Sequence, residues 1–180
     1  MDATSAMSAD NKTRSNSPFW QFSIKFYAVP GVAPACIRLQ DEAGVDVNVL
    51  FFLLWNASQG RSLSEAEVQQ ADHAVAPWRS ITVIPLREIR RTLKTAQSIV
   101  DRDAAESFRN RIKQAELEAE RLEQEALFTL VKTGRFGRAG AVPLDAARAS
   151  IAAYEALLRP LPREPLDTIL AAFAKHCSSG

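Results

Sequence analysis

The chain contains one segment that is apolar on every side, Gly44-Val-Asp-Val-Asn-Val-Leu-Phe-Phe-Leu-Leu-Trp55. From Val47 to Trp55 only Asn48 is polar. A helix without a polar face has to lie inside a protein core or a membrane. This run is too short to cross a bilayer, which takes about 20 residues. It therefore predicts a buried helix over about residues 47–57, at the centre of an all-α domain.

Length and composition are those of one globular domain. The chain has 180 residues, of which 47% are hydrophobic, enough for a substantial core. We expect a single helical domain over 17–176, a disordered tail over 1–16 and a frayed end over 177–180. The first 16 residues lack the apolar run of a signal peptide, and no transmembrane segment is recognisable, so a cytoplasmic location is expected.

Charge and cysteine content narrow the classes of function. The net charge of +1 creates no overall field toward nucleic acid or membrane, so either would need a local basic patch. The two cysteines, Cys36 and Cys177, are too far apart in sequence for a metal or redox motif. They are predicted to be free thiols in a reducing compartment, with a single disulfide as the alternative.

Three helix starts carry capping signals. Ser17-Pro18 combines an N-cap residue with a proline at the first helical position. Asp46 is placed to cap the apolar helix. Ser64-Glu-Ala-Glu67 reads as a capping box, with Leu63 and Val68 as its hydrophobic staple. Local sequence thus predicts where each of these helices begins.

The segment 79–84 is ambiguous. Pro77 is expected to break or kink the helix that starts after Ser64. The β-branched run Ile81-Thr-Val-Ile84 is typical of a strand, but no partner strand is recognisable and an unpaired strand leaves its backbone unsatisfied. We therefore predict a kinked helical segment, followed by a helix from Pro85. Its buried stripe is expected to comprise Ile89, Leu93, Ala96 and Val100.

The longest predicted helix spans about residues 103–133. Its apolar positions alternate spacings of three and four and predict a narrow buried seam between charged flanks. These positions are Phe108, Ile112, Ala115, Ala119, Leu122, Ala126, Leu130 and Thr133. Further helices are expected over about 143–158 and from Leu166 onward. The predicted fold is all-α: a single compact bundle of about seven helices around the buried helix.

An ordered series of residues resembles a known bacterial family. The series comprises Trp20, Pro30-Gly31-Val32, Cys36, Leu39-Gln40-Asp41, Gly44, Asp46-Val47-Asn48, Trp55, Pro85-Leu86-Arg87, Arg90 and Leu93-Lys94. It is similar to the domain of unknown function 2390, over roughly Pro18 to the end of the long helix. The resemblance implies a proteobacterial cytoplasmic protein and carries no activity, cofactor or partner with it.

Asp46 and Asn48 are the first candidate site. Both can serve the start of the apolar helix, where backbone N–H groups need acceptors. Alternatively, they point into a ligand pocket beside that helix, lined also by Asp41 and by aromatic residues. The aromatic candidates are Trp20, Tyr27 and Trp55.

The second candidate is a pair of oppositely charged helix faces. Arg87, Arg91 and Lys94 form a basic stripe, and Glu116, Glu120 and Glu123 lie on the long helix. Two arrangements are expected: the two faces form a surface for a protein partner, or they pair with each other. Nucleic acid is not the expected ligand, because neither interleaved aromatic residues nor a helix-turn-helix or zinc signature accompanies the basic stripe.

No metal, cofactor or catalytic set is recognisable. Glu116 and Glu120 are four residues apart, but a di-iron bundle also needs Glu-x-x-His pairs and the chain has only two histidines. The residues thus leave two hypotheses. The first is a non-enzymatic helical protein that acts through protein–protein contacts. The second is a small-molecule-binding protein or enzyme with its pocket near Asp46 and Asn48.

Overall fold

The computed structural model describes residues 17–95, 100–132 and 136–178. The helices are α2 (Pro18–Tyr27), α3 (Val32–Ala43), α4 (Val47–Ser58), α5 (Glu65–Trp78), the π-helix η2 (Arg79–Val83), α6 (Ile84–Leu93), α7 (Arg102–Lys132), α8 (Pro143–Leu157) and α9 (Arg163–Ser178), and the strands are β1 (Arg61–Ser62) and β2 (Arg138–Ala139). With α5, η2 and α6 counted as one continuous helix, the described residues form seven helices. The all-α prediction is confirmed.

The predicted central helix is α4, and it is buried. Every residue from Asn48 to Ala57 is buried. Helices α2, α7 and α8 and the strand β1 pack around it. Aromatic side chains fill much of this contact: the ring of Phe52 meets Phe19 edge-on at 5.6 Å, and Trp55 meets Phe128 at 5.5 Å. Such pairs add to the free energy gained by burying apolar area.

The capping predictions are confirmed. The Ser17 hydroxyl accepts a hydrogen bond from the backbone N–H of Trp20. The Ser64 hydroxyl accepts from the N–H of Glu67, whose carboxylate accepts from the N–H of Ser64. Gly44 ends α3 with φ = 70°, a left-handed conformation that glycine adopts without steric cost. Gly44 thus lets the chain turn directly from α3 into the segment that begins α4.

The segment 79–84 is helical, as predicted, and it is not a strand. Of the two outcomes expected at Pro77, a break or a kink, the break is wrong, because α5 continues through Pro77 to Trp78 and runs directly into η2. Widened π-helical turns are one of the ways in which a helix accommodates a local misfit. Here the hydroxyl of Ser80 donates to the carbonyl of Pro77, and that of Thr82 donates to the carbonyl of Trp78.

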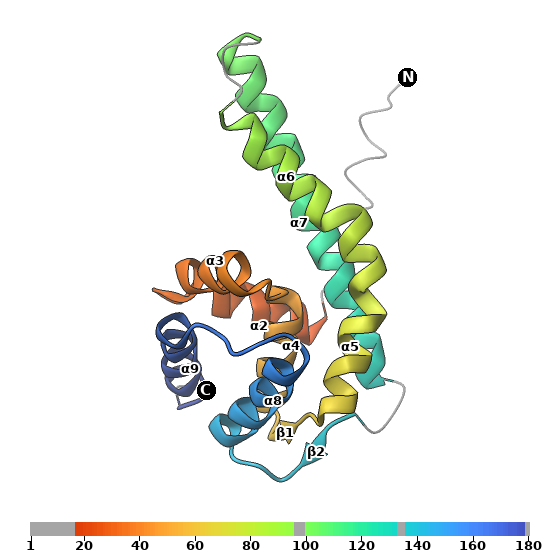
Figure 1. Cartoon of the computed structure of the whole chain (residues 1–180), viewed down its shortest axis with the longest axis vertical. Coiled ribbons are helices and arrows are strands. Elements are labelled where there is room, and N and C mark those ends of the chain that lie inside the picture. Colours follow the sequence, from red (N-terminus) through yellow and green to blue (C-terminus); the bar gives the residue numbers. More distant parts are fainter. Residues whose placement is uncertain (1–16, 96–99, 133–135, 179–180) are drawn as a thin grey trace, which may run out of the picture.

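Helices α6 and α7 form a hairpin that extends away from the other helices (Figure 1). The predicted buried stripe on α6 is wrong. The helix ends at Leu93, none of its residues is buried, and the side chain of Ile89 is 45% exposed. Val100 is 60% exposed, and Ala96 lies outside the described residues. The physical reason is that α6 has α7 as its main neighbour, so only one side of it is covered.

The predicted apolar seam of α7 is also wrong. Ala119 is buried, but Phe108, Ala115, Leu122 and Ala126 are exposed, and Thr133 lies outside the described residues. The side of α7 that is buried carries three polar residues. They are Glu116, Glu123 and Gln124. The helix is therefore turned so that the apolar line lies at the edge of its contacts, while polar side chains face the neighbouring helices.

The remaining elements close the body of the molecule. The strands β1 and β2 pair antiparallel, with Arg61 opposite Ala139. Helix α8 packs on α4 and α5, and α9 packs on α3 and α8. Helix α9 runs to Ser178, two residues beyond the predicted end of the domain at 176. The predictions for residues 1–16, 179 and 180 lie outside the described part of the chain.

Candidate functional site

The start of α4 is the centre of a buried polar network. The Asp46 carboxylate accepts hydrogen bonds from the backbone N–H groups of Asn48 (2.8 Å) and Val49 (3.4 Å) through Oδ1. The N–H of Asp46 donates to the hydroxyl of Tyr154 on α8 at 3.1 Å. Asp46 is thus the N-cap that its position predicts. Its other carboxylate oxygen, Oδ2, accepts a hydrogen bond from a residue of η2.

That residue is Arg79, the first residue of the π-helix. Its Nη1 donates to Asp46 Oδ2 at 2.5 Å and to Asp72 Oδ1 at 2.9 Å. Burial alone would lower the pKa of Arg79, but the charge of Asp46 and hydrogen bonds to both carboxylates raise it. The guanidinium therefore remains charged and holds the N-terminus of α4 against the junction of α5 and α6.

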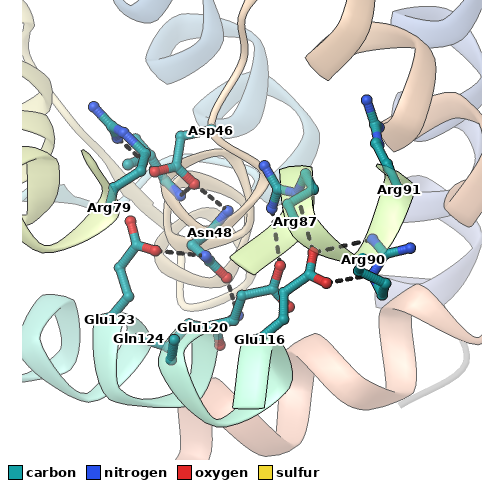
Figure 2. A network of polar contacts seen from close by, with 12 residues as sticks. Asp46, Asn48, Arg79, Arg87, Arg90, Arg91, Glu116, Glu120, Glu123 and Gln124 are labelled. Atoms are coloured by element: carbon teal, nitrogen blue, oxygen red, sulfur yellow. Dashed lines mark hydrogen bonds and ion pairs between the residues drawn. The ribbon is translucent and has the colours of Figure 1, made fainter. Parts of the chain in front are cut away.

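The side chain of Asn48 connects α4 to α7 (Figure 2). Its Nδ2 donates to Glu123 Oε2 at 2.9 Å, and its Oδ1 accepts from Gln124 Nε2 at 2.8 Å. All three side chains are buried. The side-chain amide of Asn48 therefore forms hydrogen bonds to two residues of α7 and does not cap the N–H groups of its own helix. The sequence prediction placed Glu123 on a charged flank and did not name Gln124 at all.

Glu123 is a buried acid whose pKa is raised. Burial and the neighbouring negative charge of Asp46 raise the pKa of Glu123 far above that of a free glutamate, and they outweigh the lowering effects of the Arg79 charge and of the hydrogen bond from Asn48. Within the described structure, Glu123 Oε1 has no hydrogen-bond partner. The surroundings of Glu123 therefore favour its neutral, protonated form.

A second cluster lies further along the hairpin. Arg87 donates to Glu116 Oε1 at 3.2 Å and to Glu120 Oε1 at 3.0 Å, and Arg90 holds Glu116 with two hydrogen bonds. The basic and acidic faces predicted from the sequence are therefore each other's neighbours at these positions. Because later residues of α6 pair with earlier residues of α7, the two helices run antiparallel.

The outer members of the charged faces are more exposed. Arg91 reaches across from α6 to Asp41 on α3, with Nη2 and Oδ1 2.9 Å apart and both side chains about half exposed. Lys94 is exposed at the end of α6. These residues are available to solvent, but they add little to the free energy of folding, since exposed ion pairs contribute about 0–1 kcal/mol.

The other residues predicted to line a pocket have different surroundings. Trp55, two turns beyond Asn48 on α4, packs against Phe19, Phe52 and Phe128. Tyr27 is 43% exposed and meets Phe51, and Trp20 is buried on α2. An open depression is lined by residues of α7 between Asp103 and Gln114, none of them in the predicted set. The ligand pocket near Asp46 and Asn48 stays a prediction.

The cysteines, the potential metal ligands and the apolar helices are the remaining features of the described part of the chain that bear on its chemistry. Both cysteines are free, and burial raises the pKa of the Cys36 thiol to about 12, so it is not activated. No group of three or more His, Cys, Asp or Glu residues in the described ranges is arranged to hold a metal ion. None of the described helices combines the length and apolar character that crossing a bilayer requires.

Comparison with known protein families identifies one that matches the chain. The model of a family described as "Protein of unknown function (DUF2390)" matches residues 18–127. The chain belongs to this family. The DUF2390 match runs from α2 into the last turns of α7, so it includes Asp46, Asn48, Arg79, Glu123 and Gln124. It excludes α8, α9 and Tyr154. No curated protein and no solved structure matches the chain.

Tyr154→Phe tests the link from the network to α8. The change removes the only acceptor that the structure gives to the buried N–H of Asp46. We expect the free energy of unfolding to fall by about 1–3 kcal/mol, the cost of leaving a buried donor unsatisfied. Chemical denaturation measures this. Tyr27→Phe is the matched control, since the Tyr27 ring is partly exposed, and an equal loss in both variants would contradict the assignment.

Proposed function

We propose that this protein is a non-enzymatic, cytoplasmic helical protein that acts through protein–protein contacts made by the α6–α7 hairpin. The observation that carries the proposal is that α6 has no buried residue although apolar residues recur along it at helical spacing. Large apolar side chains on the hairpin and η2 remain exposed. They are Ile81, Ile84, Ile89, Phe108, Leu117 and Leu122. Where such exposed apolar side chains lie on one face, they mark an interaction surface in soluble proteins.

The charged side of the hairpin is a weaker candidate for a partner. Arg87, Arg90, Glu116 and Glu120 already satisfy one another, so a partner would have to replace existing ion pairs. Glu123 is buried against Asn48. The exposed apolar side chains form no ion pair that a partner would have to break. We therefore assign the contact to one surface, defined as the outer face: Ile89, Phe108, Ala115 and Leu122.

A triple variant tests the proposal. We expect Ile89→Ser with Phe108→Ser and Leu122→Ser to lose the proteins that co-purify with the wild-type chain from its native cell. The matched control is Ile24→Ser with Ile37→Ser, two equally exposed apolar residues on α2 and α3. Mass spectrometry compares the three samples, and circular dichroism checks that each variant unfolds cooperatively. Retention of every partner by the folded triple variant would contradict the proposal.

A further inference from the structure

The outer face has a two-fold pattern along α7. We propose that it is occupied by a second copy of this chain, with the two α7 helices antiparallel and a two-fold axis passing near Ala115. The proposal rests on the proposed function, because it names the partner that covers the same face. The argument comes from the spacing of the apolar residues, from the charges beside them and from the position of Ile89.

The apolar residues are symmetric about Ala115. Phe108 lies seven residues before it and Leu122 seven residues after it, a spacing that returns to nearly the same side of a helix. Phe108 and Leu122 are 43% and 41% exposed. In an antiparallel pair centred on Ala115, each Phe108 lies opposite the Leu122 of the other copy. The two alanines meet at the centre, where a small side chain lets the helices approach closely.

Charges beside this line favour the same arrangement. Arg111 and Glu118 are also seven residues apart, so they lie on one flank of the line, four residues before and three after Ala115. Antiparallel pairing sets each Arg111 opposite the Glu118 of the other copy. Parallel pairing would place like charges together. Arg111 also lies over the Phe108 ring at 5.3 Å, and Glu118 pairs with Arg121, which keeps both side chains beside the line.

Helix α6 adds Ile89 to the centre of the face. Arg90 pairs with Glu116, so Ile89 lies at the level of Ala115. Arg87 and Arg91, two residues to either side, point to Glu116 and Asp41, so Ile89 lies on the other side of α6. A two-fold interface is self-complementary and contains each residue twice. It therefore buries Ile89 from both copies next to the axis.

The size of the face indicates a weak dimer. Phe108 to Leu122 spans about 21 Å of helix at about 1.5 Å per residue. A contact of this length from two helices lies at the small end of specific interfaces. We expect dissociation in the micromolar range, so the dimer should appear between about 1 and 200 µM in sedimentation-velocity ultracentrifugation.

Charge variants test the antiparallel register. In Arg111→Glu, each new carboxylate faces Glu118 of the other copy, and in Glu118→Arg each new cation faces Arg111. We expect each variant alone to dimerise at least about tenfold more weakly than wild type, since opposed like charges disfavour association. An equimolar mixture of the two variants restores both opposite-charge pairs and should form heterodimers with near wild-type affinity. A mixture that remains monomeric while the wild type dimerises would overturn this arrangement.

Cross-linking gives a second readout that does not depend on charge. Ala115→Cys places two thiols at the axis, and we expect it to form a disulfide-linked dimer under mild oxidation. Lys113→Cys, two residues from Ala115 but exposed on the opposite side of α7, is the matched control and should remain monomeric. Equal cross-linking of both would overturn the proposal, as would a wild-type chain that stays monomeric at 200 µM. If the triple variant still loses its partners in that case, the proposed function stands and only the second copy is rejected.

Discussion

Replacing Glu123 with glutamine is expected to stabilise the fold at neutral pH and to flatten its dependence on pH. In the folded chain burial and the charge of Asp46 raise the pKa of Glu123, whereas in the unfolded chain it titrates near about 4.3. Between these two values the folded state holds a proton that the unfolded state has released. The free energy of unfolding therefore falls as pH rises through this window, by up to about 1.4 kcal/mol per pH unit.

Glutamine at position 123 can form the same hydrogen bonds as a protonated glutamate, but it has no carboxyl group that must take up a proton. Its carbonyl can accept from Asn48 Nδ2, as Glu123 Oε2 does, and its N–H can donate to Asp46. At pH 7 the change should remove up to about 4 kcal/mol of protonation cost, and the gain should shrink toward pH 5. Urea denaturation from pH 5 to pH 9 measures both effects.

Two control variants accompany this experiment. Glu123→Ala also removes the proton but leaves Asn48 Nδ2 without an acceptor, so it should be less stable than Glu123→Gln at every pH in this range. Glu88→Gln changes an exposed carboxylate on α6 and should leave the pH dependence unchanged. Parallel pH curves for wild type and Glu123→Gln would show that Glu123 is ionised in the folded state, contrary to its assignment here.

Replacing Arg79 with methionine is expected to destabilise the fold by about 3–5 kcal/mol, because it leaves a buried carboxylate without its cation. The side chain of Asp46 is 6% exposed and loses the 2.5 Å contact to Nη1, while Asp72 loses its own contact at 2.9 Å. Methionine retains most of the apolar stem, so the loss reports on charge more than on packing. Chemical denaturation gives the free energy of unfolding.

The matched control for this change is Arg91→Met. The ion pair between Arg91 and Asp41 is about half exposed on both sides, so its loss should cost no more than about 1 kcal/mol. Adding Asp46→Asn to Arg79→Met should recover part of the stability, since asparagine still caps α4 but carries no charge. If Arg79→Met and Arg91→Met cost the same, the network does not hold α4 in the way described here.

The features that could be predicted from the sequence are local ones. The burial of α4 follows from its composition, and the caps Ser17, Asp46 and Ser64 each lie within three residues of the N–H group that they bind. The position of the long helix is correct to within one residue at its described start, because its periodic pattern is long. These signals need no knowledge of the tertiary fold.

The polar network could not be predicted, because its partners are far apart in sequence. Asn48 and Glu123 are 75 residues apart, and a glutamate on a helix with many charges reads as solvent-exposed. The only hint is the series Glu116, Ala119, Glu123 and Leu127, which alternates polar and apolar residues at helical spacing. These four residues lie on the buried side of α7. The apolar seam next to them has the stronger sequence signal, and for that reason the sequence predicts that the seam, and not this series, faces the core.

Because of the π-helix at Arg79–Val83, the orientation of α6 depends on the exact number of residues in this segment. A π-helical turn holds one residue more than the α-helical turn it replaces. Loss of a single residue there would restore regular α-helix and rotate all of α6 by about 100° about its axis, since a turn takes 3.6 residues. Arg87 and Arg90 would swing away from Glu116, and the hairpin would present a different side. Length variation among related chains should therefore avoid residues 79–83 and fall in the loops.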